Sequence, residues 1–260
     1  MKKTKIVCTM GPNSNDENIM RQLVKEGMDI ARFNFSHGDH EEQKGRMDML
    51  KKIREEENKP IAILLDTKGP EIRTGVLKDG KKVQLEAGET FTLTTDEIVG
   101  DNKIVSITYK GLVEDVKAGS TILIDDGLVG LEVVEIKPVA KPVNTKVNAR
   151  DIVCKVLNDG VISNKKGVNV PNVDLTMPFI SEKDYGDICF AVENDYDFIA
   201  ASFVRTAEDV MEIRKILAEK GGEDIKIISK IENMQGVRNI DDIIRVSDGI
   251  MVARGDMGVE

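Results

Sequence analysis

The sequence has few cysteines and lacks any long apolar run. Its three cysteines, Cys8, Cys154 and Cys189, are odd in number and widely spaced, which excludes a dense disulfide framework and a CxxC metal clip. The longest apolar runs, such as IAILL, are far shorter than a membrane span, and the lysine-rich first residues lack the apolar stretch of a signal peptide. We therefore expect a cytoplasmic protein whose reduced thiols act as packing residues.

The sequence also lacks an excess of positive charge. It has 37 Lys and Arg against 46 Asp and Glu, a formal net charge of −9 that argues against a broad nucleic-acid surface. A local basic pocket for phosphate is compatible with this acidic background. An apolar content of 40% over 260 residues is enough for a substantial core, in one large domain or two smaller ones.

The first 70 residues alternate short apolar runs with helical patterns. The runs KIVCTM, DIARFNF and IAILLD are continuous, as strands buried on both faces should be. Between the first two, Ser14 with Glu17 predicts a capping box and Gly27 predicts a helix stop. Ile19 and Leu23 mark one face of this expected helix.

A second helix, richer in charge, is expected from about Asp39 to Glu57. Its Met47, Leu50 and Ile53 recur at helical spacing and should face inward. Strand, helix, strand and helix in this order indicate the start of a β/α series.

The pattern changes after Gly69-Pro70. From about Thr74 to Lys166, six short strand-like segments recur between Gly, Asp and Asn turns: VQL, FTLTT, IVSITY, TILID, GLEVVEI and IVCKV. These segments indicate a small all-β insertion. We assign it to residues 71–168, between two parts of one parallel domain at 1–70 and 169–260.

Helical signals return after the insertion. Capping patterns stand at Ser181 to Asp184 and at Thr206 to Asp209. The second precedes an apolar stripe that ends at two glycines: Val210, Ile213, Leu217, Gly221 and Gly222. The runs DFIAASF, IKIISKI and GIMVARG then complete a count of six parallel strands.

Three charged residues stand at the ends of two of these expected strands. Lys230 and Glu232 lie in ISKIEN, and Asp256 lies in MVARGDMG. The carboxyl ends of parallel strands form the active-site mouth of β/α folds, so we expect these groups to meet. Two carboxylates suit Mg²⁺ or Mn²⁺ and leave positions for substrate oxygens and water. A structural salt bridge, or two acids facing helix dipoles, is the alternative.

Two arginines and a glycine near the same mouth suit anions. Arg32 and Arg73 can each grip phosphoryl oxygens through a planar guanidinium, the alternative being ordinary surface arginines. Gly255, which precedes Asp256, would let backbone amides approach a substrate carboxylate closely.

A further group of residues supplies neutral and anionic oxygens. Asn34, Ser36 and Asp66 suit a weakly hydrated monovalent cation, and Thr67 adds a carbonyl or hydroxyl oxygen. Taken alone, Asn34 and Ser36 are better explained as turn residues or helix caps. His37, which follows them, is on its own an ordinary loop residue.

Eight segments stand in the order found in pyruvate kinases and cover essentially the whole chain: KIVCTMGP, ARFNFSHG, LLDTKGPEIRTG, DDG, KKGVNVP, SFVR, IISKIEN and DGIMVARGDMGVE. The sequence therefore resembles the amino-terminal part of that family. The resemblance implies an α/β fold, an incomplete (β/α)₈ TIM barrel with six of its eight strands and an all-β barrel lid domain inserted after the third strand. It also implies that the carboxyl-terminal domain is missing, so we expect a fragment.

The resemblance implies phosphoryl transfer from phosphoenolpyruvate to ADP, which gives pyruvate and ATP in the last step of glycolysis. Lys230 and Arg32 would be catalytic, with Lys230 stabilising the charge that grows on the phosphoryl group and the enolate oxygen. The implied contacts to the substrate are from Arg32, Lys230, Gly255 and Asp256.

The same resemblance implies a nucleotide, two kinds of metal ion and an assembly. The implied nucleotide contacts are Asn34, His37, Arg73 and Lys166. Mg²⁺ or Mn²⁺ would be held by Glu232 and Asp256, and K⁺ by Asn34, Ser36, Asp66 and Thr67. The implied partners are phosphoenolpyruvate, ADP or ATP and pyruvate, in a homotetramer without nucleic acid or membrane. Asn172 replaces a usual glycine of the family and should accept its left-handed backbone.

Two other functions fit part of the pattern. A metal-dependent lyase or mutase acting on phosphoenolpyruvate or pyruvate would also use Lys, Glu, Asp and Mg²⁺ on a barrel, but it has no need of a nucleotide lid or of the K⁺ set. An inactive truncated fragment is the second alternative, because six strands leave two unpaired edges. On that basis we expect residues 1–260 alone to be poorly soluble and inactive. The proton donor to the enolate and any allosteric effector stay open.

Overall fold

The computed structural model describes residues 3–143 and 148–259. Its contacts divide the chain into two units. We call the first the barrel unit and the second the β unit. The barrel unit comprises Met1–Pro70, Phe179–Ile231 and Gly236–Val252, and the β unit comprises Glu71–Pro178, Glu232–Gln235 and Ala253–Glu260. The expected division at residues 71 and 168 stays an interpretation of the sequence.

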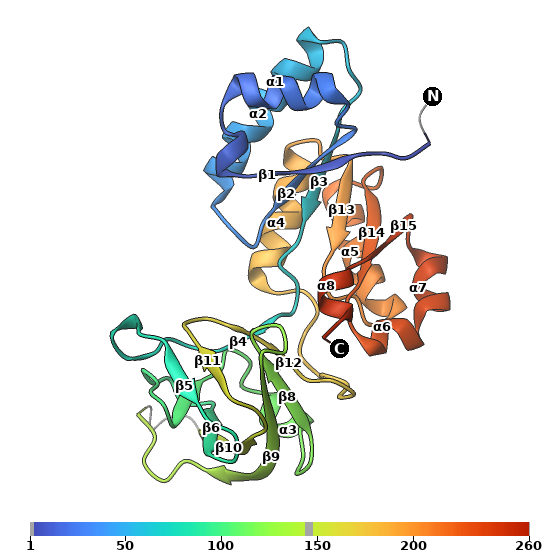
Figure 1. The fold of residues 1–260 in the computed structure, drawn as a ribbon. Helices are drawn as coiled ribbons and strands as arrows, with labels where there is room; N and C mark the ends of the chain where they lie inside the picture. Colours follow the sequence, from blue (N-terminus) through green and yellow to red (C-terminus); the bar gives the residue numbers. More distant parts are fainter. Residues whose placement is uncertain (1–2, 144–147, 260) are drawn as a thin grey trace. The chain divides into compact units, whose positions relative to one another are not determined.

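The barrel unit is built on a parallel sheet of six strands in the order β1-β2-β3-β13-β14-β15 (Figure 1). The strands are β1 Val7–Met10, β2 Ile30–Asn34, β3 Ala62–Asp66, β13 Phe198–Ala201, β14 Lys226–Ile231 and β15 Gly249–Val252. Every neighbouring pair is parallel, which confirms the expected incomplete barrel. Ile63, Leu64 and Leu65 are buried in succession, as a strand covered on both faces requires.

Helices alternate with these strands along the chain. They are α1 Glu17–Glu26, α2 His40–Glu56, α4 Glu182–Glu193, α5 Ala207–Lys220, α6 Met234–Arg238 and α7 Ile240–Val246. Helix α2 begins after Asp39, whose carboxylate accepts a hydrogen bond from the Glu42 amide, and it buries Met47, Leu50 and Ile53 as predicted. The two later helix starts are also confirmed, because Ser181 caps α4 and Thr206 caps α5.

The predicted start of α1 is wrong by two residues. Asp16 is the cap, and its carboxylate accepts hydrogen bonds from the amides of Asn18 and Ile19 at 2.8 and 3.1 Å. Ser14 instead belongs to a short 3₁₀ turn and exchanges hydrogen bonds with the backbone of Gly11. An ionised carboxylate next to the helix amides is the stronger acceptor, so it sets the helix start.

This start also rotates the buried face of α1. Met20 and Val24 are buried, whereas Ile19 is 44% exposed, so the expected stripe of Ile19 and Leu23 is wrong by one position. The stop at Gly27 is confirmed, since its φ of 106° is left-handed and its amide closes the last turn.

The β unit contains a seven-stranded sheet in the order β4-β12-β8-β9-β10-β6-β7, together with the pair β11-β5. Its strands are β4 Ile72–Arg73, β5 Val83–Leu85, β6 Thr90–Thr94, β7 Ile104–Ser106, β8 Thr121–Ile124, β9 Val129–Pro138, β10 Arg150–Val156, β11 Gly160–Ile162 and β12 Gly167–Asn169. All six expected strand segments contain a strand. Two short helices, α3 Leu112–Asp115 and α8 Arg254–Met257, were not expected.

Side chains from these strands form one apolar core. Phe91, Leu131 and Ile152 are completely buried in it. Cys154 lies in the same core, where burial raises the pKa of its thiol to about 12, so it is a packing residue as predicted. Asn172 adopts the left-handed φ of 60° that was expected of it.

Candidate active site

Polar side chains of the barrel unit gather at the carboxyl ends of successive parallel strands. Arg32 lies on β2, Asp66 is the last residue of β3 and Lys230 lies near the end of β14. Ser202 directly follows β13, and Thr9 on β1 is the register partner of Arg32. Five neighbouring strands thus contribute one polar side chain each to the same edge of the sheet, where β/α folds place their chemistry.

The carboxylate of Asp66 is the centre of this group. It is 1% exposed, and its Oδ1 accepts a hydrogen bond from Lys230 Nζ at 3.1 Å. Its Oδ2 accepts from the guanidinium of Arg32, which forms an ion pair with it. Two cations therefore converge on one buried anion, and the three groups together keep one positive charge. Removing such charges from water costs free energy that only close pairing offsets. Each cation therefore stays next to the carboxylate of Asp66.

Two hydroxyl residues complete the network, and the sequence patterns did not single them out. Lys230 Nζ donates to Ser202 Oγ at 2.8 Å, and Ser202 Oγ lies 2.7 Å from the carbonyl oxygen of Thr67. Arg32 Nη1 donates to Thr9 Oγ1 at 2.8 Å. The signal that identifies Ser202 is its position directly after an apolar strand.

The expected cation ligands lie on two neighbouring strand ends. Asn34 and Asp66 are register partners on β2 and β3, and the Phe35 amide donates to the Asp66 carbonyl at 3.0 Å. Asn34 Oδ1 accepts from the Ser36 amide at 2.9 Å, so Asn34 also serves as a turn residue. Thr67 is buried next to them, and its Oγ1 accepts from the Ser202 amide.

This set of donors fits a hard monovalent cation. All of its candidate ligand atoms are oxygens, from an amide, a carboxylate, hydroxyls and backbone carbonyls, and only one group is anionic. The register of β2 and β3 brings Asn34 and Asp66 together. His37 follows on the same loop and is exposed.

Two candidates of the β unit pair with acidic neighbours of that unit. Arg73 makes two hydrogen bonds to the carboxylate of Glu71, at 2.8 and 2.9 Å, and a third to the carbonyl oxygen of Lys165. The hydrogen bonds to Glu71 raise the pKa of Arg73. Lys166, just before β12, forms a 2.8 Å ion pair with Asp125. Both cations are half-buried, in contrast to Lys230.

The remaining candidates also belong to the β unit. Glu232 directly follows β14 and is 2% exposed, and Asp256 lies half-buried on α8. A side chain at Gly255 would meet nothing within 4 Å, so its backbone is open to a ligand. Within residues 3–143 and 148–259 no cluster of three or more His, Cys, Asp and Glu is arranged to hold a metal. Carboxylate oxygens are the ligands that Mg²⁺ prefers in proteins, so the chemistry of these two side chains suits that ion.

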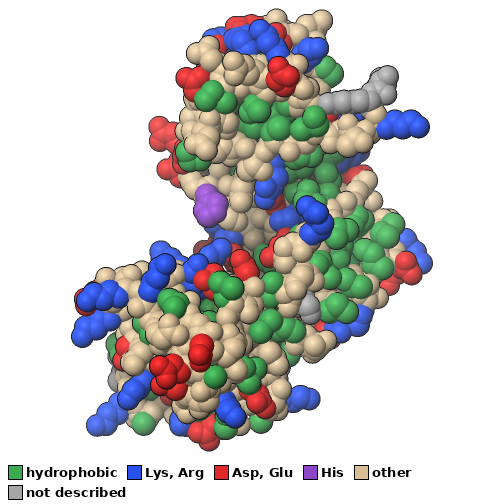
Figure 2. All heavy atoms as spheres, in the orientation of Figure 1, with side chains coloured by type: hydrophobic (Ala, Val, Ile, Leu, Met, Phe, Trp, Pro, Cys, Tyr) green, Lys and Arg blue, Asp and Glu red, His purple; other side chains and the backbone are tan. Residues whose placement is uncertain are grey.

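The structure therefore brings Arg32, Asp66, Thr67 and Lys230 into one network, with Asn34 beside it. Figure 2 shows acidic and basic side chains interspersed over the visible face of the molecule. Among the described residues no helix is long and apolar enough to cross a membrane.

Comparison with known proteins identifies the family. The family model described as the barrel domain of pyruvate kinase matches residues 1–260. The chain belongs to the pyruvate kinase family. This confirms the resemblance carried by the eight sequence segments.

Individual proteins named pyruvate kinase are similar in sequence to this chain over all or nearly all of its length. The enzyme named pyruvate kinase from Clostridium acetobutylicum is 53% identical over 100% of this chain and 53% of its own length. That from Bacillus licheniformis is also 53% identical, over 100% of this chain and 43% of its own length. The crystal structure of a pyruvate kinase from Cryptosporidium parvum matches 99% of this chain and 52% of its own chain, with a TM-score of 0.88 and 43% identity. The chain thus spans about half the length of the pyruvate kinases it matches.

Proposed function

We propose that the protein carrying these residues transfers a phosphoryl group from phosphoenolpyruvate to ADP, giving pyruvate and ATP as the last step of glycolysis. The observation that carries the proposal is the convergence of Arg32 and Lys230 on the buried carboxylate of Asp66, at the carboxyl ends of the parallel strands. Membership in the pyruvate kinase family supports the reaction assigned to this arrangement.

Lys230 and Arg32 manage the charge of the reaction. As the bond between the phosphoryl group and the enol oxygen breaks, negative charge grows on that oxygen and spreads over the transferring group. An ammonium and a guanidinium that are already fixed need no reorganisation when this charge appears, so they stabilise the transition state more than the ground state. Asp66 and Ser202 hold the Lys230 ammonium, while Asp66 and Thr9 hold the Arg32 guanidinium.

The carboxylates of Glu232 and Asp256 are the proposed ligands of Mg²⁺ or Mn²⁺, and Gly255 exposes its backbone to the substrate carboxylate. Asn34, Ser36, Asp66 and Thr67 are the proposed ligands of K⁺. When bound, these ions supply positive charge that polarises substrate oxygens.

The nucleotide is assigned to Asn34, His37, Arg73 and Lys166. Arg73 already presents two parallel donors to the carboxylate of Glu71, the geometry that also suits a phosphate. Binding of a nucleotide phosphate would therefore exchange one anionic partner for another. Membership in the family supports an enzyme that acts on small molecules, and we propose that it is cytoplasmic and forms a homotetramer.

The direct test is product formation by the longest natural chain that contains residues 1–260. Phosphoenolpyruvate and ADP with Mg²⁺ and K⁺ should give pyruvate and ATP in equal amounts, with ATP followed by phosphorus NMR and pyruvate by proton NMR. Consumption of phosphoenolpyruvate without ATP would support a lyase or mutase instead. Absence of any consumption by a folded protein would refute the proposed reaction.

A further inference from the structure

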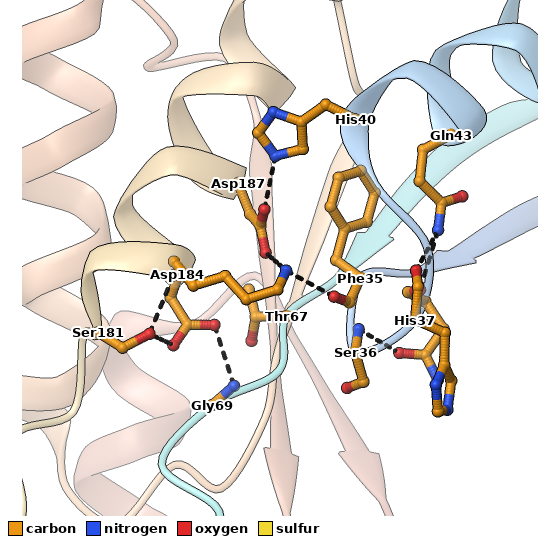
Figure 3. Close-up of polar contacts among 12 residues, drawn as sticks. Phe35, Ser36, His37, His40, Gln43, Thr67, Gly69, Ser181, Asp184 and Asp187 are labelled. Carbon is orange, nitrogen blue, oxygen red and sulfur yellow. Dashed lines mark hydrogen bonds and ion pairs between the residues drawn. The ribbon is translucent and has the colours of Figure 1, made fainter.

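Strand β2 ends at Asn34, and the loop that follows it carries Ser36 and His37; side chains from two helices hold this stretch of backbone. Gln43 on α2 is buried, and its Nε2 donates to the carbonyl oxygens of both Asn34 and His37, at 3.0 and 2.9 Å. Figure 3 shows Gln43 reaching this loop. Because the amide group satisfies two carbonyls at once, it fixes both ends of the turn.

Lys183 on α4 holds the carbonyl that lies between the two proposed cation ligands. Its Nζ donates to Phe35 O at 2.7 Å, across 148 positions of sequence. Phe35 is itself anchored by its buried ring. The centroid of this ring lies 5.7 Å from the ring centroid of Phe190 and 6.2 Å from that of Tyr196. The backbone between Asn34 and Ser36 is therefore fixed from α4 as well as from α2.

The Lys183 side chain is 44% exposed, and its ammonium is paired with a buried carboxylate. Asp187, one turn later on α4, is buried and accepts from Lys183 Nζ at 2.7 Å through its Oδ2. Its Oδ1 lies 2.7 Å from His40 Nε2, at the start of α2 (Figure 3). A buried carboxylate with a histidine on one side and an ammonium on the other orients Lys183 toward the loop.

The same first turn of α4 also holds the loop that follows β3. The carboxylate of Asp184 is buried and accepts from the Gly69 amide at 3.1 Å, as well as from the Ser181 hydroxyl. The Gly69 backbone has a left-handed φ of 69°, and a Cβ there would come within 2.7 Å of Ser202 O. Consecutive residues of α4, Lys183 and Asp184, thus hold the two loops that carry Ser36 and Thr67 and directly follow the strand ends Asn34 and Asp66.

We propose that Lys183 and Gln43 are positioning residues that set the affinity of this site for a monovalent cation. The inference rests on the proposed function, in which K⁺ binds Asn34, Ser36, Asp66 and Thr67. Neither residue is among those ligands. Each instead holds the backbone that presents two of them, Asn34 and Ser36. When either hydrogen bond is lost, the loop is more mobile, and part of the binding free energy of the cation is spent on ordering it.

The first experiment measures the K⁺ concentration that gives half-maximal activity in the longest natural chain. Lys183→Met should raise this concentration by about tenfold, the scale expected for loss of one charge-assisted hydrogen bond, while kcat at saturating K⁺ changes less than about twofold. Lys183→Arg should recover most of the loss, because a guanidinium can also donate to Phe35 O. Gln43→Leu should shift the K⁺ dependence in the same direction.

Lys44→Met is the matched control. Lys44 is an exposed residue of α2 that pairs with Asp48 one turn away, so its loss should leave the K⁺ dependence unchanged. A double variant, Lys183→Met with Asp187→Asn, tests whether an unpaired buried carboxylate disturbs the fold of the single variant. It removes the charge of Asp187 together with the ammonium of Lys183. The K⁺ concentration for half-maximal activity should rise as much as in Lys183→Met.

The second readout does not depend on activity. Thermal unfolding is followed in KCl and in tetramethylammonium chloride at equal ionic strength, and the rise in Tm specific to KCl reports K⁺ binding. This rise should shrink in Lys183→Met and be retained in Lys44→Met. In one outcome the wild-type chain makes ATP and responds to K⁺, while Lys183→Met and Gln43→Leu show the same response as wild type. This result would overturn the positioning role of Lys183 and Gln43 and leave the proposed function intact. A wild-type chain without ATP formation refutes the proposed function, and one without any response to K⁺ overturns the inference together with the K⁺ site.

Discussion

The barrel unit and the β unit hold their candidate cations in different ways. In the barrel unit, Lys230 is 9% exposed and shares Asp66 with Arg32, in a network drawn from separate strands. In the β unit, Arg73 pairs with a residue two positions away, and Lys166 pairs with Asp125 at a half-buried position. The first arrangement is preorganised and costly to break, whereas the second is local and exchangeable. This difference suits the role proposed for Lys230 at the reacting phosphoryl group and the reversible nucleotide contact proposed for Arg73 and Lys166.

The largest expected effect follows from removing the shared anion. Asp66→Asn leaves the Arg32 and Lys230 cations without a compensating charge in a buried position. The free energy of unfolding should fall by about 3–5 kcal/mol, the range found when a buried pair loses one partner. Urea unfolding of wild type and variant measures this change. A loss well below 1 kcal/mol would show that the network is solvent-screened and would break the comparison.

A smaller effect is expected from the hydroxyl that orients the ammonium. Ser202→Ala removes the acceptor that lies 2.8 Å from Lys230 Nζ. Because a hydrogen bond to a charged group is worth about 1.5–3 kcal/mol, we expect kcat to fall by roughly 10- to 100-fold. Steady-state kinetics should show a change in kcat with little change in the KM for ADP. A change confined to that KM would assign Ser202 to the nucleotide.

Arg73→Met tests the exchangeable cation of the β unit. The KM for ADP should rise by about tenfold, with kcat reduced much less, since the lost contact is made equally in the ground state and the transition state. Initial rates at varied ADP measure both constants. An equal loss in kcat and kcat/KM would instead place Arg73 at the reacting phosphoryl group.

The smallest effect is expected at the anion that Arg73 holds. Glu71→Gln should change the free energy of unfolding by no more than about 0.5–1 kcal/mol, because the Arg73 side chain is 40% exposed and the pair is screened by solvent. The loss of unfolding free energy in Glu71→Gln is compared with that in Asp66→Asn under the same conditions. Similar losses in the two variants would contradict the difference between the two units.

Much of the fold follows from the sequence, because the deciding forces are local or periodic. The continuous apolar runs predicted the six parallel strands, and Met47, Leu50 and Ile53 predicted the buried face of α2. The predicted start of α1 was wrong because two capping-type residues, Ser14 and Asp16, precede the helix, and the sequence pattern does not rank them.

The site was predicted only in part, for a physical reason. The sequence singled out Lys230 as a charge at a strand end, Arg32 as an anion-binding arginine near the same mouth, and Asp66 as an oxygen ligand for a cation. Their partner Ser202 is a small polar residue whose role depends on the register of β13 with β3 and β14. The contact of Lys183 with Phe35 O joins residues far apart in sequence, and no spacing along the chain predicts it.

The turnover of Lys230→Met, measured beside Lys226→Met, tests the central claim most directly. Both lysines lie on β14, but Lys226 is an exposed residue at the opposite end of the strand. We predict that Lys230→Met lowers kcat for ATP formation by at least about 10²-fold, the cost of losing one donor to a developing oxyanion, and that Lys226→Met keeps wild-type turnover. Near-normal turnover by a folded Lys230→Met enzyme would contradict the account.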